Sequence, residues 1–279
     1  MSRSGITRVG ERRAPAACVA AALLALAGTA AGQPQCRGYV YLTLDTGNMR
    51  HAEEIADILR RQDVRATFFL ASEKTPRGDF SLDPSWAAYW KARADEGHAF
   101  GSHTWRHGRF VADDAVGVRY RPQFGDDAGR TISLTPPAVC EELRRVDKAF
   151  AAYTGRGLDA LWRAPGGRTT PRALAAAQDC GFAHVGWAPA GFLGDELPSE
   201  SYPNEMLLAR ALRDVRDGDV LMAHLGIWSR RQPFAPMLEP LIAGLKQRGL
   251  CFRTLREHTG YRAQAPFASQ LAASAAPLR

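Results

Sequence analysis

The five cysteines of this sequence include no Cys-x-x-Cys pair, which argues against a zinc–thiolate site. The sequence also has no concentrated basic stripe with interleaved aromatic residues, so nucleic acid is not an expected partner in spite of a formal charge of +7. No internal repeat is present, and no apolar run after residue 31 is long enough to span a membrane. What remains is a 279-residue chain, nearly half apolar, that is long enough for one large α/β domain or two small ones.

Residues 1–31 have the pattern of a secretory signal peptide. Basic residues come first, an alanine- and leucine-rich run follows over residues 16–27, and Thr29-Ala30-Ala31 supplies the small residues of a cleavage site. The apolar run is too short for a comfortable membrane span. We therefore expect a periplasmic or secreted protein with no stable membrane insertion once the signal is removed. Its formal charge would then be +4, and the sequence indicates no oligomeric state.

Four cysteines follow the predicted signal, an even number that suits disulfide bonding in an oxidising compartment. Cys36, Cys140, Cys180 and Cys251 allow three pairings. Cys36 and Cys251 are the best-placed pair if they lie at the starts of neighbouring first and last strands.

Residues 36–260 alternate between strand-like and helix-like segments and are predicted to form the catalytic domain. The strand-like segments are 39–44, 66–70, 98–102, 160–162, 184–187, 220–223 and 251–255, and the helix-like ones are 52–62, 85–96, 137–153 and one opened by Thr170-Pro171. Repeated β-α units predict an α/β fold with a parallel sheet or barrel, in which active sites form where strands end. Residues 109–137 break the rhythm and predict a long loop or small insertion. The tail, residues 261–279, is rich in Ala, Gln and Ser and is expected to be flexible.

The segment His103-Thr104-Trp105-Arg106-His107 carries two histidines four residues apart at a predicted strand end. If it takes a helical turn, both imidazoles can converge on one metal ion. Histidines with this spacing are also common as surface or capping residues. The neighbouring strand ends favour the metal-ligand interpretation.

Asp45 ends the first apolar strand, and Arg163 follows a later one. Asp45 is interpreted as a general base or a metal ligand, or else as a cap of the helix after Gly47. An arginine at a buried strand end needs an anionic partner, because a lone buried charge is very costly. We expect Arg163 to pair with Asp45 and to orient it.

Two further strand ends carry candidate residues. Gly166 either forms a tight turn or offers its backbone N–H to an oxyanion. His224 is either a packed rim residue or a general acid that protonates a leaving amine. Three tryptophans near these ends are interpreted as core residues or as walls for sugar stacking: Trp162, Trp187 and Trp228.

These segments, in this order, resemble the polysaccharide deacetylase family with the NodB-homology domain, a carbohydrate esterase group. The family motif T-F-D-D-G is similar to residues 43–47 (TLDTG), H-S/T-x-x-H to residues 103–107 (HTWRH), and R-x-P-Y/x-G to residues 163–167 (RAPGG). A loose D-x-x-D/W match covers residues 187–192, and L-x-H is similar to residues 222–224 (MAH). The likeness spans roughly residues 39–255.

The resemblance implies an irregular (β/α) barrel and a divalent metal ion, usually zinc and sometimes cobalt or nickel. It implies hydrolysis of the N-acetyl group of a GlcNAc-type sugar in a glycan such as peptidoglycan. The implied roles in this sequence are metal ligands His103 and His107, general base Asp45, its tuning partner Arg163, oxyanion donor Gly166 N–H and general acid His224.

The sequence departs from the family pattern at three positions. Thr46 replaces the second aspartate of the first motif, the family's third metal ligand, and a neutral hydroxyl is a far weaker ligand than a carboxylate. Ala190 replaces the aspartate that tunes the general acid, although Asp195 or Glu196 could return from the following loop. Gly166 replaces a frequent tyrosine, which removes an aromatic wall and keeps a backbone donor.

Two main function hypotheses follow. The first is an exported metal-dependent deacetylase of peptidoglycan or another N-acetylated glycan. The second is a non-catalytic glycan-binding barrel that has lost the third metal ligand, because Thr46 stands at that position. A related hydrolase of another C–N bond or of an O-acetyl ester is the remaining alternative, and a panel of amide and ester substrates distinguishes it.

Overall fold

The computed structural model of the protein describes Met1, Gly5 and residues 36–261. The predicted signal peptide therefore lies outside the described residues apart from Met1 and Gly5, and the predicted tail does so apart from Tyr261. In the part of the chain that is described, no helix combines the length and the apolar character needed to cross a membrane.

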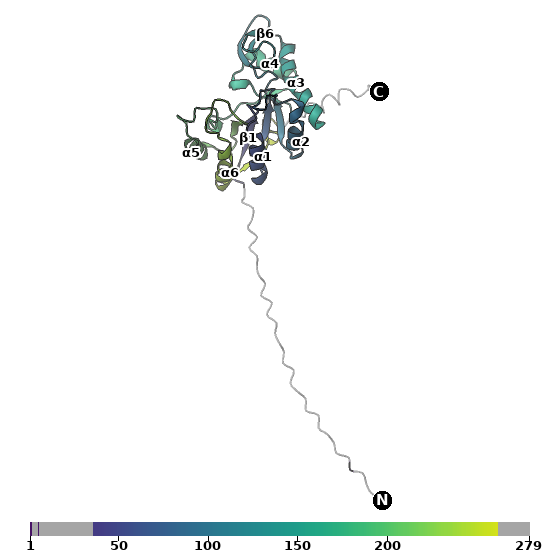
Figure 1. The fold of residues 1–279 in the computed structure, drawn as a ribbon, viewed down its shortest axis with the longest axis vertical. Coiled ribbons are helices and arrows are strands. Elements are labelled where there is room, and N and C mark those ends of the chain that lie inside the picture. The colour runs from purple at the N-terminus through teal and green to yellow at the C-terminus, as the bar shows by residue number, and fades with distance from the viewer. Residues whose placement is uncertain (2–4, 6–35, 262–279) are drawn as a thin grey trace. The chain divides into compact units, whose positions relative to one another are not determined.

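A seven-stranded parallel sheet forms the centre of the domain (Figure 1). Its strands are β1 (Gly38–Asp45), β2 (Thr67–Leu70), β3 (Ala99–Ser102), β7 (Leu161–Trp162), β8 (Ala183–His184), β9 (Val220–His224) and β10 (Leu250–Phe252). They are arranged in the order β10-β1-β2-β3-β7-β8, with β9 also pairing with β1. β1 pairs with β10 through its first residues and with β9 through its last ones, so the sheet divides along this strand.

Helices connect the strands and cover the sheet. They are α1 (Ala52–Arg61), α2 (Ala87–Asp95), α3 (Pro136–Thr154), α4 (Pro171–Asp179), α5 (Asn204–Asp214) and α6 (Leu238–Gln247). Parallel strands joined by helical crossovers form the irregular (β/α) barrel that the sequence predicts. The helix predicted to open at Thr170-Pro171 is α4, whose first turn is capped by the Thr170 hydroxyl accepting from the N–H of Ala173 at 3.2 Å. The sequence pattern did not reveal α5 or α6.

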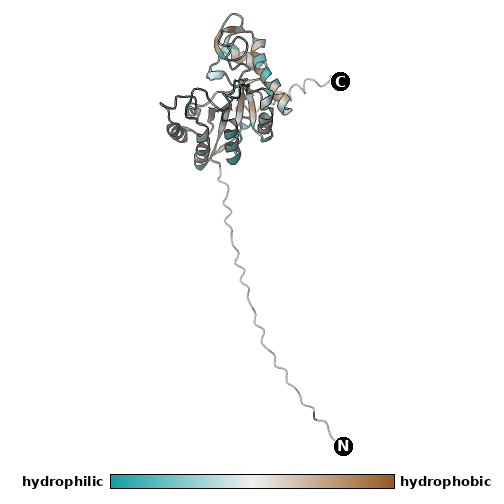
Figure 2. Ribbon diagram, viewed as in Figure 1, coloured by the Kyte–Doolittle hydropathy of each residue, from teal (hydrophilic) through white to brown (hydrophobic). Residues whose placement is uncertain are grey.

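The alternation of side chains along β1 decides which residues reach the inside of the barrel. Val40, Leu42 and Leu44 join the largest apolar cluster, which includes the buried faces of α1 and α6. Tyr41 belongs to a separate inner cluster, and Asp45 shares its face because the side-chain period of a strand is two. Figure 2 shows the hydrophobic colour concentrated on the strands and hydrophilic stretches along the helices. The strand therefore carries Asp45 on its inner face, at its carboxyl end.

The segment that interrupts the β-α rhythm is a small antiparallel sheet rather than an irregular loop. β4 (Arg109–Asp113), β5 (Val118–Arg121) and β6 (Ile132–Leu134) pair in that order, and Figure 1 shows β6 next to α3 and α4. Phe110 and Tyr120 are fully buried in a cluster that includes residues of α3 and α4. The apolar face of the insertion thus fixes it to the barrel directly after the predicted histidine cluster.

Two disulfide bonds use the four cysteines of the described domain. Cys36 is bonded to Cys251 and Cys140 to Cys180, with Cα atoms 5.6 and 5.9 Å apart. The first bond is the pair predicted from the sequence, and the register of β1 with β10 explains it, because Tyr39 is the parallel partner of Cys251. The second bond ties α3 to the end of α4.

Candidate active site

Parallel register brings the predicted site residues to one edge of the sheet. Asp45 ends β1 and is the register partner of His224, which ends the neighbouring strand β9. His103 directly follows β3, and Arg163 directly follows β7, the strand that pairs with β3. Because the carboxyl ends of parallel strands lie at the same edge, residues more than a hundred positions apart in the chain meet there.

Asp45 and Arg163 form the buried ion pair that the sequence predicts. Nη1 of Arg163 donates to Oδ1 of Asp45 at 2.8 Å, and both side chains are almost completely buried. Burial alone would raise the pKa of Asp45, but the charge of Arg163, supported by that of His224, lowers this pKa below its ordinary value. Asp45 is therefore ionised at neutral pH, the state that a general base or a metal ligand needs.

Arg163 makes three further hydrogen bonds. Its Nη1 donates to Oγ1 of Thr43 at 2.7 Å. Its Nε and Nη2 donate to the carbonyl oxygens of Val185 and Gly186 at 3.3 and 3.1 Å. A guanidinium held by several acceptors in one plane fixes the direction of its bond to Asp45.

His103 and His107 converge although the segment between them does not take a helical turn. The segment between them forms a tight turn in which Thr104 and His107 have left-handed φ angles of 63° and 46°. Such angles are uncommon for non-glycine residues and are found more often at functional sites. The turn is held by Glu142 of α3, whose carboxylate accepts from the N–H and the Nε of Arg106 at 3.0 and 2.7 Å. The two imidazole centroids lie 4.9 Å apart.

Neighbouring oxygens fix the nitrogen that each of these histidines presents. Nδ1 of His103 lies 2.9 Å from the carbonyl oxygen of Arg163, and because a carbonyl can only accept, Nδ1 carries the proton and Nε2 keeps its lone pair. Nδ1 of His107 lies 2.6 Å from Oε1 of Gln123 in the same way. Histidines that bind a metal through Nε2 have this kind of outer partner. Burial lowers the pKa of His103 to about 3, against the attraction of Asp45, so the imidazole is neutral at pH 7.

Glu73 is a site residue that the sequence patterns do not mark. It lies in the loop after β2 with its side chain buried. Oγ1 of Thr46 donates to Oε1 of Glu73 at 2.6 Å and accepts from the N–H of Ala71 at 3.1 Å. The other carboxylate oxygen, Oε2, lies 3.8 Å from Nδ1 of His107. A carboxylate therefore stands beside the histidine pair although Thr46 has replaced the aspartate of the first motif. The one sequence signal is an acid placed three residues after a strand end.

His224 has a carboxylate partner, Asp195. Oδ2 of Asp195 accepts from the backbone N–H of His224 at 2.7 Å, and its two oxygens lie 3.1 and 3.2 Å from Nδ1 of His224. Burial alone would lower the pKa of His224, but the charge of Asp195 and its hydrogen bond raise this pKa to about 10. Of the two acids that could compensate for Ala190, Asp195 is the one in contact, and it keeps His224 protonated at neutral pH.

Gly166 lies in the turn Pro165–Gly167 at the same edge of the sheet. Its φ angle is 65°, a left-handed conformation that glycine adopts without steric cost. The turn is closed by the N–H of Gly167 donating to the carbonyl of Ala164 at 2.8 Å. The tight-turn interpretation is therefore confirmed. Gly166 also shares a cavity wall with His107, as an oxyanion donor would require, and that role stays a prediction.

The model of the polysaccharide deacetylase family matches residues 32–185, more than half of the chain. The chain belongs to the polysaccharide deacetylase family. A chitin deacetylase from Colletotrichum lindemuthianum is 35% identical over 103 residues, which are 32% of this chain and 40% of that protein. The match thus spans less than half of that relative.

Solved structures of members of the family share the barrel of this chain. A family 4 acetyl xylan esterase from Clostridium thermocellum, in complex with a cobalt ion, has a TM-score of 0.61 at 21% identity, over 84% of this chain and 95% of that one. A pseudoenzyme of the same carbohydrate esterase family, CE4, from Bacillus anthracis has a TM-score of 0.59 at 18% identity, over 79% of this chain and 65% of that one. At these identities the likeness shows the fold, and it confirms the predicted irregular (β/α) barrel.

A cavity of about 480 Å³ opens onto the candidate site, and Glu73, His107 and His224 line it. Trp228 also lines it, with 55% of its surface exposed, as a stacking wall for a sugar ring would require. Trp162, by contrast, is completely buried and belongs to the core.

The donor types at this edge fit a divalent metal ion. His103 and His107 each have an Nε2 atom not used by the partners described above, and zinc binds imidazole nitrogen together with carboxylate oxygen. Within residues 36–261, no three His, Cys, Asp or Glu side chains are already grouped as a metal site. Two carboxylates lie beside the histidine pair: Asp45 Oδ2 is 3.6 Å from Nε2 of His103, and Glu73 Oε2 is 3.8 Å from Nδ1 of His107.

Proposed function

We propose that this protein is a metal-dependent hydrolase that removes N-acetyl groups from GlcNAc-type sugars of peptidoglycan or another polysaccharide. The observation that carries the proposal is a pair of oppositely tuned groups on neighbouring strands, an ionised Asp45 and a protonated His224. Amide hydrolysis needs such a base to activate water and such an acid to protonate the leaving nitrogen. Membership of the polysaccharide deacetylase family supports the reaction class.

His103 and His107 would hold the metal ion, which is zinc or alternatively cobalt or nickel. We assign Glu73 as the carboxylate ligand that stands in for the missing aspartate, with Thr46 positioning it by a hydrogen bond. This assignment leaves Asp45 free to act as the base. A metal ion bound there supplies Lewis-acid polarisation of the acetamide carbonyl and a more acidic water.

The protein's own groups then carry the proton transfers. Asp45 accepts a proton through Oδ2, the oxygen that Arg163 leaves free, as the water oxygen bonds to the acetyl carbon. The N–H of Gly166 donates to the developing oxyanion. His224 gives its proton to the amide nitrogen as the C–N bond breaks, and Asp195 stabilises the imidazolium before that transfer. The products are acetate and a free amino sugar.

We further propose that the protein works in the periplasm or outside the cell. The two disulfide bonds support this location, because such bonds persist in oxidising compartments. The signal-peptide pattern of residues 1–31, basic residues followed by an apolar run and small residues, also supports export.

The test is acetate release and metal content measured on the same purified protein. Zinc, cobalt and nickel are added in turn, the substrates are peptidoglycan and chitin oligosaccharides, and a His103→Ala/His107→Ala double variant is the control. The proposal expects bound metal and acetate release in the wild type and neither in the variant. No acetate from any amino-sugar glycan with any of the three metals would refute it, and release only from O-acetyl esters would change the substrate class.

A non-catalytic glycan-binding barrel is the second candidate. It is favoured by Thr46 at the position where the family motif has its third metal ligand. Retention of the protein on an insoluble N-acetylated glycan without acetate release would support it. Metal-dependent turnover of the same glycan would exclude it.

A further inference from the structure

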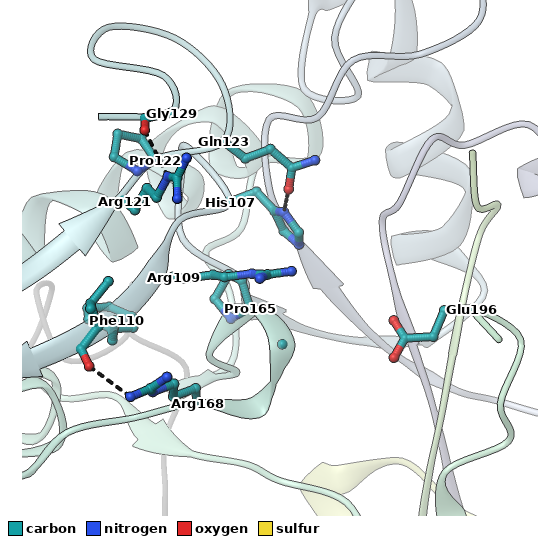
Figure 3. Close-up of a pocket in the computed structure, with 12 residues that line it drawn as sticks. His107, Arg109, Phe110, Arg121, Pro122, Gln123, Gly129, Pro165, Arg168 and Glu196 are labelled. Atoms are coloured by element: carbon teal, nitrogen blue, oxygen red, sulfur yellow. Dashed lines mark hydrogen bonds between the residues drawn. The ribbon is translucent and has the colours of Figure 1, made fainter. Parts of the chain in front are cut away.

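A cavity of about 860 Å³ adjoins the candidate active site, and three arginines form part of its wall (Figure 3). Arg109 comes from β4, Arg121 from β5, and Arg168 from the segment after the Gly166 turn. His107 and Gly166 line the same cavity. The arginines and the candidate catalytic groups therefore face one continuous space.

Arg109 and Arg121 are direct cross-strand partners in the β4–β5 ladder. Partners in an antiparallel pair share one face of the sheet, and like charges at such positions destabilise it. In the described part of the chain, no carboxylate forms an ion pair with either of them or with Arg168. Arg121 instead donates to the carbonyl of Gly129 at 2.8 Å, and Arg168 to the carbonyl of Val111 at 3.1 Å.

The fold of the insertion does not depend on this charged face. Phe110 and Tyr120, the next cross-strand pair along the ladder, point the opposite way and are completely buried. Their apolar contacts hold the strands against α3 and α4. The two facing arginines thus repel each other without contributing to the packing of the insertion. This indicates that an anion binds on their face of the sheet.

The acidic residue of the cavity wall is Glu196. Figure 3 shows its carboxylate across the cavity from Arg109 and His107. The arginine side of the cavity therefore keeps an excess of positive charge. Arginine suits this setting, because its planar guanidinium binds a carboxylate or a phosphate with two parallel hydrogen bonds.

We propose that this arginine wall, made of Arg109, Arg121 and Arg168, binds an acidic group of the substrate. The substrate is then an anionic N-acetylated glycan, with the acid on or next to the sugar that is deacetylated. The inference rests on the proposed function and specifies its substrate class. The guanidinium of Arg109 lies close to Gly166, because a Cβ atom added to this glycine would be 3.9 Å from Nε of Arg109. An acid bound by Arg109 therefore lies beside the proposed oxyanion donor.

The test compares oligosaccharides of equal length that differ only in charge. One alternates N-acetylglucosamine with glucose and is neutral, one alternates N-acetylglucosamine with glucuronic acid, and one carries sulfate in place of the carboxylate. The variants are Arg109→Gln/Arg121→Gln and, separately, Arg168→Gln. Arg119→Gln is the matched control, because Arg119 lies exposed on the same strand, β5, and does not line the cavity.

Wild-type enzyme should have a kcat/KM for an acidic chain that is about tenfold to a hundredfold higher than for the neutral chain, as expected for charged hydrogen bonds. The double variant should lose this preference through a higher KM on the acidic chains. Arg119→Gln should behave as the wild type. An equal preference in the double variant and the wild type, or a preference for the neutral chain, would overturn the inference.

Binding measured by calorimetry separates this inference from the proposed function. If the wild type binds acidic chains in a salt-dependent way and the double variant does not, the arginine wall is confirmed even where no acetate is released. If acetate is released from neutral and acidic chains alike, the proposed function stands and the arginine wall fails. If the wild type binds the glucuronate chain but not the sulfated chain, the arginine wall recognises a carboxylate. If it binds both, the wall recognises negative charge of either kind. The Tm of the double variant should equal or exceed that of the wild type, because a repulsive pair is removed, which shows that the variant is folded.

Discussion

The hydroxyl of Thr46 donates a hydrogen bond of 2.6 Å to Oε1 of Glu73. Thr46 stands where the family motif has a metal-binding aspartate, and Glu73 comes from the loop after the neighbouring strand, β2. A hydroxyl supplies no negative charge, but by donating a hydrogen bond it can position a neighbouring carboxylate. A carboxylate from the neighbouring strand's loop thus lies 3.8 Å from Nδ1 of His107.

This relationship predicts that metal affinity depends on Glu73. Glu73→Gln should weaken zinc binding by about a hundredfold or more, because a neutral amide replaces a charged ligand, whereas Thr46→Val should weaken it by about tenfold through loss of an outer hydrogen bond. Affinity is measured by competition with a chromophoric chelator, so activity is not needed. Glu196→Gln is the control, since it removes a carboxylate that lines the cavity across from His107. Equal affinities for Glu73→Gln and Glu196→Gln would show that Glu73 is only a structural partner of Thr46.

The Asp45–Arg163 pair shows what the sequence could predict. The strand pattern placed each residue at a strand end, and the cost of a lone buried charge required a partner for the arginine. Parallel register then brings both ends to one edge, so the pairing followed from general rules. The Cys36–Cys251 bond followed in the same way from the positions of the first and last strands.

Other parts of the site depend on loop geometry, which has no sequence period. Glu73 and Asp195 contact their partners from irregular segments. No residue spacing in the sequence therefore predicted that Glu73 belongs to the site, or that Asp195 rather than Glu196 contacts His224. The turn between the two site histidines contains left-handed residues other than glycine, which propensity rules disfavour.

Two elements were hidden by competing signals. The insertion alternates exposed Arg109 and Arg121 with buried aromatic partners, but an irregularity between Phe110 and Ala112 in β4 interrupts the period of two. The helix α6 includes Pro240 in its first turn and Gly244 near its middle, both poor helix formers, and tertiary packing of its apolar face overrides them.

The pKa of His224 predicts a pH effect of Asp195. Burial lowers this pKa and the Asp195 charge raises it to about 10, so Asp195→Asn should leave burial opposed only by the charges of Asp45 and Glu196 and make His224 lose its proton at lower pH. The alkaline limb of the kcat profile should move to lower pH, and kcat at pH 8 should fall by up to about a hundredfold, the smaller range of general-acid effects. The histidine titration is followed by NMR alongside the kinetics. Glu196→Gln should shift the limb much less, and an unmoved limb in Asp195→Asn would show that His224 is not the acid.

His98 predicts a loss of stability in acid. Its Nδ1 accepts from the N–H of Ala66 at 2.9 Å, and burial lowers its pKa from 6.5 to about 4. The unfolded chain therefore binds this proton first as the pH falls, so the contribution is fully present above about pH 6.5 and is lost between about pH 6.5 and 4. The loss from this group should approach roughly 3 kcal/mol. Urea unfolding across this range should show a shallower decline for His98→Asn, whose side-chain oxygen keeps the acceptor without the titration; identical slopes would assign the acid sensitivity to other groups.

Arg163 predicts a strong coupling with Asp45. Arg163→Ala leaves a completely buried carboxylate without its partner, which should lower the free energy of unfolding by about 3–5 kcal/mol and raise the pKa of Asp45. Asp45→Asn should cost less, because Thr43 and the two backbone carbonyls still hold the guanidinium. The double variant Asp45→Asn/Arg163→Ala should recover on the order of 2 kcal/mol relative to Arg163→Ala, because the lone charge is gone.

Urea unfolding of the four proteins in the presence of a chelator measures this coupling without a metal contribution. Losses that simply add would mean that the pair contributes nothing beyond its separate contacts. Recovery in the double variant would instead show that the arginine's main structural task is to neutralise Asp45. In that case, the same ion pair keeps the proposed base ionised and stabilises the fold. Any change that separates Arg163 from Asp45 would then lower both the ionised fraction of Asp45 and the free energy of unfolding.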